Sequence, residues 1–220
     1  MSNIVGIACS VLWVLLILGI SMYLEKKGLL SDEGSRKFVH IGVSNFWFIA
    51  MYFFTSSFWA SLIPILFIVV NFLSYRFSLI SSMERKDKEI NDLGTVYYPI
   101  SLTVLALFSF SSLSLPYVGA LGILTMGYGD GFAAIIGKKW GKRALPFSKG
   151  KKTVLGSMAM FLISFCVISM VLAFYHPENV LQAALLLALA AAIFEAVTPY
   201  GLDNLSVPLG VSFLYQLVFF

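Results

Sequence analysis

The chain has 220 residues, of which 59% are hydrophobic and only 12% are charged, and its formal net charge is +4. A soluble domain of this length cannot bury so large an apolar fraction, so the composition excludes a soluble globular protein. It indicates an all-α, polytopic membrane protein. Because no linker, low-complexity tract or fixed-period repeat interrupts the sequence, we expect residues 1–220 to form a single domain.

Eight apolar runs follow one another along the chain. The longer runs match the roughly 20 residues that an α-helix needs to cross a bilayer, whereas the second, fourth and last require tilt or burial against neighbouring helices. We therefore predict seven or eight transmembrane helices, with eight preferred. The first run is not expected to be a cleavable signal, because no basic residue precedes it. The runs cover residues 4–24, 39–54, 58–75, 96–110, 117–136, 154–175, 180–197 and 207–220.

The basic residues are confined to three connections between these runs. All 15 lysines and arginines lie within residues 26–37, 76–88 and 138–152. With eight spans these are the first, third and fifth connections, which share one face of the membrane. The positive-inside rule makes that face cytoplasmic and places the N-terminus outside. For several of these residues topology and contact with anionic membrane lipids are a sufficient explanation.

Two further features concern the loops. The segment at residues 83–92 mixes charges of both signs at helical spacing and predicts a short surface helix. No basic stripe alternates with exposed aromatic residues, so nucleic acid is not an expected partner.

The motif Arg36-Lys37-x-x-His40 stands at the mouth of the second run. In a helix Arg36 and His40 share one face, and an arginine offers a bidentate fork to phosphate oxygens. The alternative is a pair of topology-determining cations beside an interfacial histidine. With Asp130, these three residues are our candidate catalytic residues.

Residues 127–157 hold the densest set of residue types that bind phosphate. Glycines let a backbone approach a ligand, and lysines attract anions. The common phosphate loop G-x-x-x-x-G-K-[ST] does not fit, because five residues separate Gly131 from Gly137 and Lys139 occupies the Ser/Thr place. We predict a nucleotide site of another design. Its candidate residues are Gly129, Gly131, Gly137, Lys138, Lys139, Lys151, Lys152, Thr153 and Gly156.

Asp130 is the one charged residue of the run at residues 117–136. A carboxylate at membrane depth costs a few kcal/mol, so it should face a cavity, a cation or a partner. The flanking glycines favour a ligand site, since they leave room, over a buried pair with a lysine or arginine.

Glu195 ends the seventh run, and Asp203 and Asn204 follow in a predicted loop between Pro199 and Pro208. On the predicted topology they share a face with Asp130. Carboxylate and amide oxygens from separate segments suit Mg²⁺, so we predict a divalent-cation site formed by Asp130, Glu195, Asp203 and Asn204. For Asp203 and Asn204 a turn or cap pair is the alternative.

Five motifs in fixed order resemble those of a known family. They are Arg36-Lys37-x-x-His40, the stretch from Leu93 to Pro99, Gly129-Asp130-Gly131-x-Ala133-x-x-x-Gly137-Lys138-x-x-Gly141, Lys151-Lys152-Thr153-x-x-Gly156-Ser157, and Glu195 with Asp203-Asn204. Together they resemble the phytol kinase, dolichol kinase and CTP-dependent diacylglycerol kinase family. The phosphatidate cytidylyltransferases are more distant relatives, and their proline-glycine-histidine-glycine-glycine stretch is absent here.

The resemblance implies a multi-pass membrane enzyme that phosphorylates a lipid alcohol with CTP and a divalent metal. It implies catalytic or nucleotide-binding roles for Arg36, Lys37, Asp130, Gly137 and the group Lys151-Lys152-Thr153. Phytol, another isoprenoid alcohol and diacylglycerol are all open as acceptors. The oligomeric state is also open, as is the role of Asp130 as a base or a metal ligand.

Two alternative functions remain. The first is nucleotidyl transfer, in which a lipid phosphate attacks the α-phosphorus of the nucleotide. The second is an ion-coupled transporter that uses Asp130 and Glu195. Transport is disfavoured because the polar groups gather on one face, whereas a pathway needs them at several depths.

Overall fold

The computed structural model describes residues 2–77, 94–146, 148 and 152–220. In these ranges the regular structure is helical, apart from one isolated β-bridge between Ala144 and Thr153. The all-α prediction is therefore confirmed. The surface helix predicted at residues 83–92 and the candidate Lys151 lie outside the described residues.

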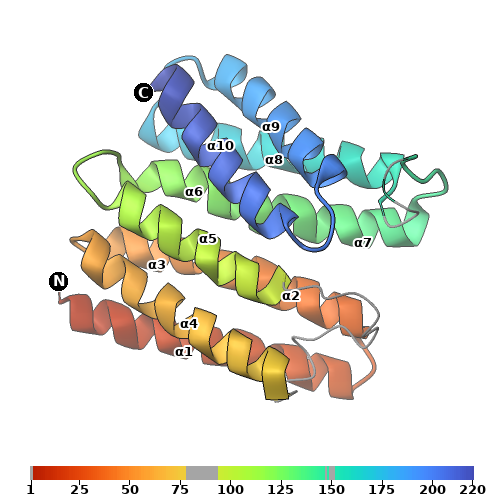
Figure 1. The fold of residues 1–220 in the computed structure, drawn as a ribbon, viewed down its shortest axis with the longest axis horizontal. Helices are drawn as coiled ribbons and strands as arrows, with labels where there is room; N and C mark the ends of the chain where they lie inside the picture. Colours follow the sequence, from red (N-terminus) through yellow and green to blue (C-terminus); the bar gives the residue numbers. More distant parts are fainter. Residues whose placement is uncertain (1, 78–93, 147, 149–151) are drawn as a thin grey trace.

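The helices lie alongside one another as a bundle, and the chain runs back and forth between its two ends (Figure 1). The elements are α1 (Asn3–Lys26), α2 (Asp32–Ser44), α3 (Phe46–Phe53), α4 (Ser57–Phe77), α5 (Gly94–Ser109), α6 (Pro116–Leu124), the π-helix η2 (Thr125–Asp130), α7 (Gly131–Trp140), α8 (Val154–Tyr175), α9 (Val180–Val197) and α10 (Asp203–Phe219).

The connections divide between the two ends of the bundle. The α1–α2, α7–α8 and α9–α10 connections lie at one end, and the α3–α4, α5–α6 and α8–α9 connections lie at the other with both termini (Figure 1). The described basic connections thus share an end, as the spacing of the charges predicts. The side of the membrane that this end faces stays a prediction.

Five helical stretches in the described part of the chain are long and apolar enough to cross a membrane: α1, α4, the continuous rod from Pro116 to Trp140, α8 and α9. α5 is a shorter apolar helix. Large apolar side chains such as Leu12, Phe72 and Phe174 are exposed on the outside, where hydrocarbon can solvate them. A multi-pass membrane protein follows from this, and the number of spans stays a prediction of seven or eight.

The second apolar run is two helices rather than one. α2 begins well before the run, at Asp32, because the Ser31 hydroxyl caps it by accepting from the Gly34 N–H at 3.2 Å. It stops at Asn45, whose side-chain amide donates to the Ile41 carbonyl at 2.9 Å. The Tyr128 hydroxyl donates to the Asn45 side-chain carbonyl at 2.8 Å, which ties this break to η2.

The predicted loop between Pro199 and Pro208 is the clearest error in the expected elements. α10 begins at Asp203 and carries Pro208 inside the helix. An acidic residue in the first turn faces the positive end of the helix dipole, which favours the earlier start.

The core lies where α6 packs against α3, α5 and α10. Trp47 of α3 is fully buried, and its indole N–H donates to the Pro116 carbonyl at 2.8 Å. Gly122 of α6 meets the Pro208 carbonyl and the Ser212 hydroxyl of α10, so there is no room for a side chain there.

We expect Gly122→Val to lower the thermal stability of the purified protein, since overpacking of this kind costs about 1–3 kcal/mol. Gly19→Val is the matched control, because a Cβ on Gly19 of α1 meets nothing within 4 Å. The measurement is the thermal unfolding midpoint in detergent. Equal midpoints for the two variants would contradict the packing of α6 on α10.

Candidate functional site

Three carboxylates from three elements converge at the end of the bundle that carries the described basic connections. Asp130 is the last residue of η2, Glu195 lies in the last turn of α9, and Asp203 is the first residue of α10. One oxygen of each lies within 4.8 Å of the others, and Asp130 and Glu195 are each only 6% exposed. At an effective dielectric constant of about 20, like charges at this separation repel by about 3–4 kcal/mol per pair. The cluster therefore needs cations.

Two lysines supply part of the compensating charge. Lys37 of α2 forms an ion pair with Asp130. The Lys152 ammonium lies 2.9 Å from Asp203 Oδ2 and 3.2 Å from Glu195 Oε1, and it donates to the Thr198 carbonyl at 3.2 Å. Two ammonium groups against three carboxylates leave one formal negative charge among these side chains.

The electrostatics of Lys152 and Asp203 reflect this imbalance. Burial lowers the pKa of the Lys152 ammonium, but Asp203 and Glu195 outweigh it, so the pKa lies above the usual lysine value. Burial and the nearby Asp130 raise the pKa of Asp203 above its usual value, although Lys152 opposes them. A carboxylate in this situation gains from any further cation placed beside it.

The buried pair with Lys37 was the alternative interpretation of Asp130, and the structure contains that pair. Lys37 is not the only group near the Asp130 carboxylate in the described part of the chain. Glu195, Asp203 and the His40 ring also approach it. His40 Nε2 lies 3.9 Å from Asp130 Oδ2.

The Arg36-Lys37-x-x-His40 motif lies in regular helix, as its predicted spacing requires. Lys37 reaches Asp130, the His40 ring packs against Tyr98 in a tilted arrangement with ring centroids 4.0 Å apart, and Arg36 pairs with Glu33 at 2.5 Å. All three motif residues line one cavity.

Asn204 lies next to the cluster, but its side-chain amide forms hydrogen bonds to neighbouring residues of the same turn. The Asn204 amide nitrogen donates to the Gly201 carbonyl at 3.0 Å and to Asp203 Oδ1 at 3.2 Å. These bonds close the turn that leads into α10 and hold the Asp203 carboxylate in place. Of the two alternatives, a turn or a cap pair, the turn describes this amide nitrogen, since α10 has no side-chain cap hydrogen bond.

The candidate glycines lie at helix contacts. A Cβ on Gly129 would lie 2.7 Å from both Met160 Sδ and Ser164 Oγ of α8, and one on Gly131 would meet Ile41 of α2. Neighbouring helices fill the space on the Cβ side of both glycines, and a nucleotide-binding role for them stays a prediction. They let η2 pack closely against α2 and α8.

A glycine also allows close packing where α7 contacts α8. Thr153 caps α8 by accepting from the Gly156 N–H at 3.1 Å, and a Cβ on Gly137 would lie 2.9 Å from the Thr153 hydroxyl. Lys138 and Lys139 are exposed at the end of α7. Among the predicted nucleotide residues that the structure describes, Gly129 and Gly131 flank Asp130, and Lys152 forms ion pairs with Glu195 and Asp203.

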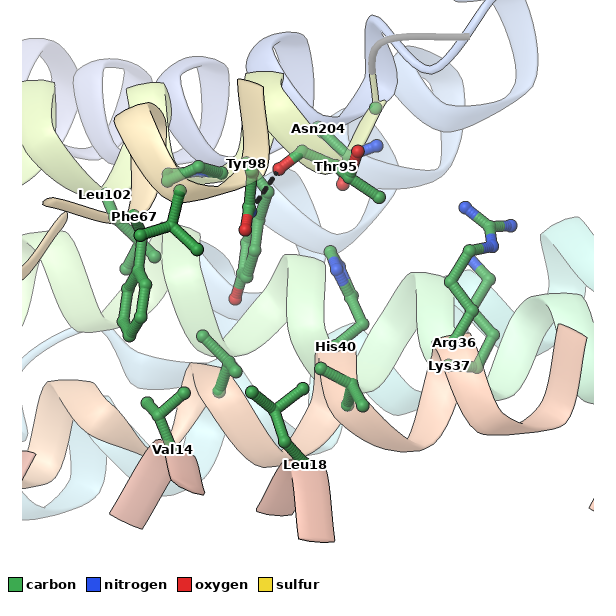
Figure 2. A pocket seen from close by; sticks show the side chains of 16 residues that line it. Val14, Leu18, Arg36, Lys37, His40, Phe67, Thr95, Tyr98, Leu102 and Asn204 are labelled. Carbon is green, nitrogen blue, oxygen red and sulfur yellow. Dashed lines mark hydrogen bonds between the residues drawn. The ribbon is translucent and has the colours of Figure 1, made fainter. Parts of the chain in front are cut away.

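The cavity contains two residues that were not among the candidate site residues, Asn71 and Tyr98, although Tyr98 belongs to the motif from Leu93 to Pro99. It lies among α1, α2, α4 and α5. Figure 2 shows Arg36 and Lys37 at one end, Phe67 and Leu102 at the other, and His40 and Tyr98 between them. The sequence alone could have indicated Asn71, because a side-chain amide within an apolar span requires a hydrogen-bond partner or a function.

Comparison with known proteins gives a consistent set of relatives. The chain is 34% identical over 189 residues to a phytol kinase of Synechocystis sp., covering 85% of this chain and 80% of that protein. It is 32% identical to a probable chloroplastic phytol kinase of Triticum aestivum, covering 89% of this chain and 71% of that protein. A dolichol kinase of Schizosaccharomyces pombe is 36% identical over 97 residues, which are 44% of this chain and 19% of that protein. No protein-family model and no solved structure matches.

We expect Lys152→Met to destabilise the protein by about 3 kcal/mol, because removing one partner leaves buried carboxylates uncompensated. Adding Asp203→Asn to the same chain should restore part of the loss, since it removes one of the repelling charges. The thermal unfolding midpoint without divalent cations checks both.

The matched control for this pair of variants is Lys142→Met, which removes an exposed lysine from the same connection. A loss in Lys142→Met as large as that in Lys152→Met would show that Lys152 does not hold the cluster.

Proposed function

This chain belongs to the phytol kinase family, and we propose that it transfers the γ-phosphoryl group of CTP to the hydroxyl group of a lipid alcohol. Phytol or another isoprenoid alcohol is the proposed acceptor, and the basic, cytoplasmic end of the bundle is the proposed place of reaction. The observation that carries the proposal is the cluster Asp130–Glu195–Asp203, which adjoins a cavity with one polar and one apolar end. Such a site can bring a water-soluble nucleotide to a membrane-dissolved substrate.

The cluster has the chemistry of a Mg²⁺ site. Mg²⁺ in phosphoryl-transfer enzymes is held by one or two carboxylates together with substrate phosphates and water. Asp130, Glu195 and Asp203 would hold the ion, and their excess negative charge supports this. When bound, the ion would supply neutralisation of the charge on the phosphate oxygens.

The remaining polar residues would bind and orient the two substrates. Arg36, Lys37, Lys151 and Lys152 are the proposed phosphate ligands, since phosphoryl transfer depends mainly on positioning and on stabilising charge. The alcohol oxygen forms the new bond to the γ-phosphorus, the bond from that phosphorus to the β-phosphate oxygen breaks, and CDP leaves. The hydroxyl proton passes to a carboxylate, for which Asp130 is the candidate if it is not a metal ligand.

Nucleotidyl transfer is the alternative that the same groups could support. A lipid phosphate would then attack the α-phosphorus, and pyrophosphate would leave. The identity of the transferred group separates the two reactions.

We expect the purified protein, with Mg²⁺ in lipid-detergent micelles, to transfer label from [γ-³²P]CTP to phytol. Asp130→Asn should reduce kcat by about a thousandfold, a loss of the size seen when one charge-stabilising group is removed. The measurement is labelled lipid phosphate resolved by chromatography, with thermal unfolding as the check that Asp130→Asn is folded.

The controls separate the possible reactions. Label that enters lipid from [α-³²P]CTP with phosphatidate as acceptor would establish nucleotidyl transfer and overturn the kinase proposal. Full turnover by folded Asp130→Asn would remove Asp130 from the mechanism. Loss of transfer on chelation, restored by added Mg²⁺, is expected.

The proposed sidedness has a separate test. In a chain whose Cys9 and Cys166 are replaced by alanine, we expect Lys142→Cys to react with a membrane-impermeant maleimide only after permeabilisation. Ser112→Cys, exposed at the opposite end, should react in sealed cells. The reverse pattern would place the basic end outside.

A further inference from the structure

We propose that the cavity among α1, α2, α4 and α5 is the binding site for the acceptor, a single-chain lipid alcohol. Its hydroxyl group would lie beside Tyr98, Asn71 and His40, and its hydrocarbon chain would extend toward Phe67 and Leu102. This assignment rests on the proposed function and deepens it, because it names the place and the shape of the acceptor.

The first support is a set of buried polar atoms that lack partners. The Tyr98 hydroxyl and the Asn71 side-chain oxygen have no hydrogen-bond partner in the described part of the chain, and the two residues are only 5% and 8% exposed. Such groups are rare in native proteins, where buried polar atoms are nearly always satisfied. Both residues line the cavity.

One of these atoms is an acceptor and the other can donate, so a ligand hydroxyl group can bond to both. The Asn71 amide nitrogen already donates to the Thr95 carbonyl at 2.7 Å, which leaves its oxygen as an acceptor. The Tyr98 hydroxyl can donate. An alcohol has one donor and two acceptor positions and can serve both groups, whereas an ionised phosphate has no hydrogen to offer Asn71.

His40 adds a third position of the same kind. Its Nε2 has no hydrogen-bond partner among the residues that the structure describes. In the neutral tautomer whose proton is on Nδ1, the imidazole presents a lone pair at Nε2, which can accept from a ligand hydroxyl.

The polar part of the cavity borders the carboxylate cluster. His40 Nε2 is 3.9 Å from Asp130 Oδ2, and Lys37, which pairs with Asp130, lines the cavity. Asn204, which also lines the cavity, directly follows Asp203. A hydroxyl group held at Tyr98 and His40 would thus lie on the side of the cavity where the nucleotide is proposed to bind.

The other end of the cavity suits a hydrocarbon chain. Figure 2 shows Phe67 and Leu102 there, with Val14 and Leu18 of α1 along one wall. Leu102 is fully buried in the core and closes this end. The lining combines apolar side chains with placed polar groups, as small-molecule sites do. Phe67 lines the same end, so in this assignment it contacts the far end of the hydrocarbon chain.

Steady-state kinetics with phytol tests the polar contacts. We expect Tyr98→Phe and Asn71→Leu each to raise KM for phytol by about tenfold and to leave KM for CTP unchanged, since each removes one hydrogen bond. Tyr97→Phe is the matched control, because Tyr97 precedes Tyr98 in the same helix and is not part of the cavity wall. Equal KM values for phytol in Tyr98→Phe, Asn71→Leu and Tyr97→Phe would overturn the assignment.

Acceptor length tests the apolar end. Phe67→Trp fills the cavity and should shift the ratio of kcat/KM for farnesol over geranylgeraniol toward farnesol, whereas Phe67→Ala should shift it the other way. Phe72→Trp, at an exposed position of the same helix, is the control and should leave the ratio as in the unaltered chain. A ratio that does not respond to either change at Phe67 would contradict the proposal.

Photocrosslinking separates this inference from the proposed function. A farnesol analogue with a diazirine group should label α2, α4 or α5 without nucleotide, and phytol should compete more strongly than diacylglycerol. Labelling of the cavity without phosphoryl transfer to any alcohol would refute the kinase and support the cavity. Phosphoryl transfer with labelling confined to the outer faces of other helices, or stronger competition by diacylglycerol, would refute the cavity assignment alone.

Discussion

The structure depends on the burial of three carboxylates within 4.8 Å of one another at one end of a membrane bundle. Asp130, Glu195 and Asp203 would repel one another too strongly to remain ionised without nearby cations. Lys37 approaches the cluster from α2, and Lys152 directly precedes the residue that caps α8. The cluster therefore joins elements that are far apart in the chain. Its residual negative charge supports the proposed role as a cation site in addition to its structural one.

Close packing makes this convergence possible. η2 is a π-helix, a wide turn often found at functional sites, and it ends at Asp130. Gly129 faces α8 and Gly131 faces α2, so both neighbours approach the π-helix without a side chain between them. The glycines therefore act through the protein's own packing, and they bring Lys37 and Lys152 to the carboxylates. Larger residues would push both lysine-bearing elements away.

The cluster and the cavity divide the site into two environments. The cluster holds charged groups at the end with the described basic connections. The cavity extends into the bundle between helices such as α1 and α4, which are long enough to span a membrane. Lys37 and His40 belong to both, since they line the cavity and approach Asp130. A reaction between a polar donor and an apolar acceptor needs such a boundary, because neither substrate can enter the solvent of the other.

The sequence by itself determined the class of the protein, its family and the residue types of the site. Apolar run length and charge placement reflect local, one-dimensional constraints of a bilayer, and Asp130 and Glu195 stand out because charge is costly there. Only the tertiary structure decided which groups meet. It showed that Gly129 and Gly137 serve helix contacts, that Asp203 begins a helix, and that Asn71 and Tyr98 line a cavity beside His40. Sequence spacing could not predict this, because contacts between helices depend on rotation and approach in three dimensions.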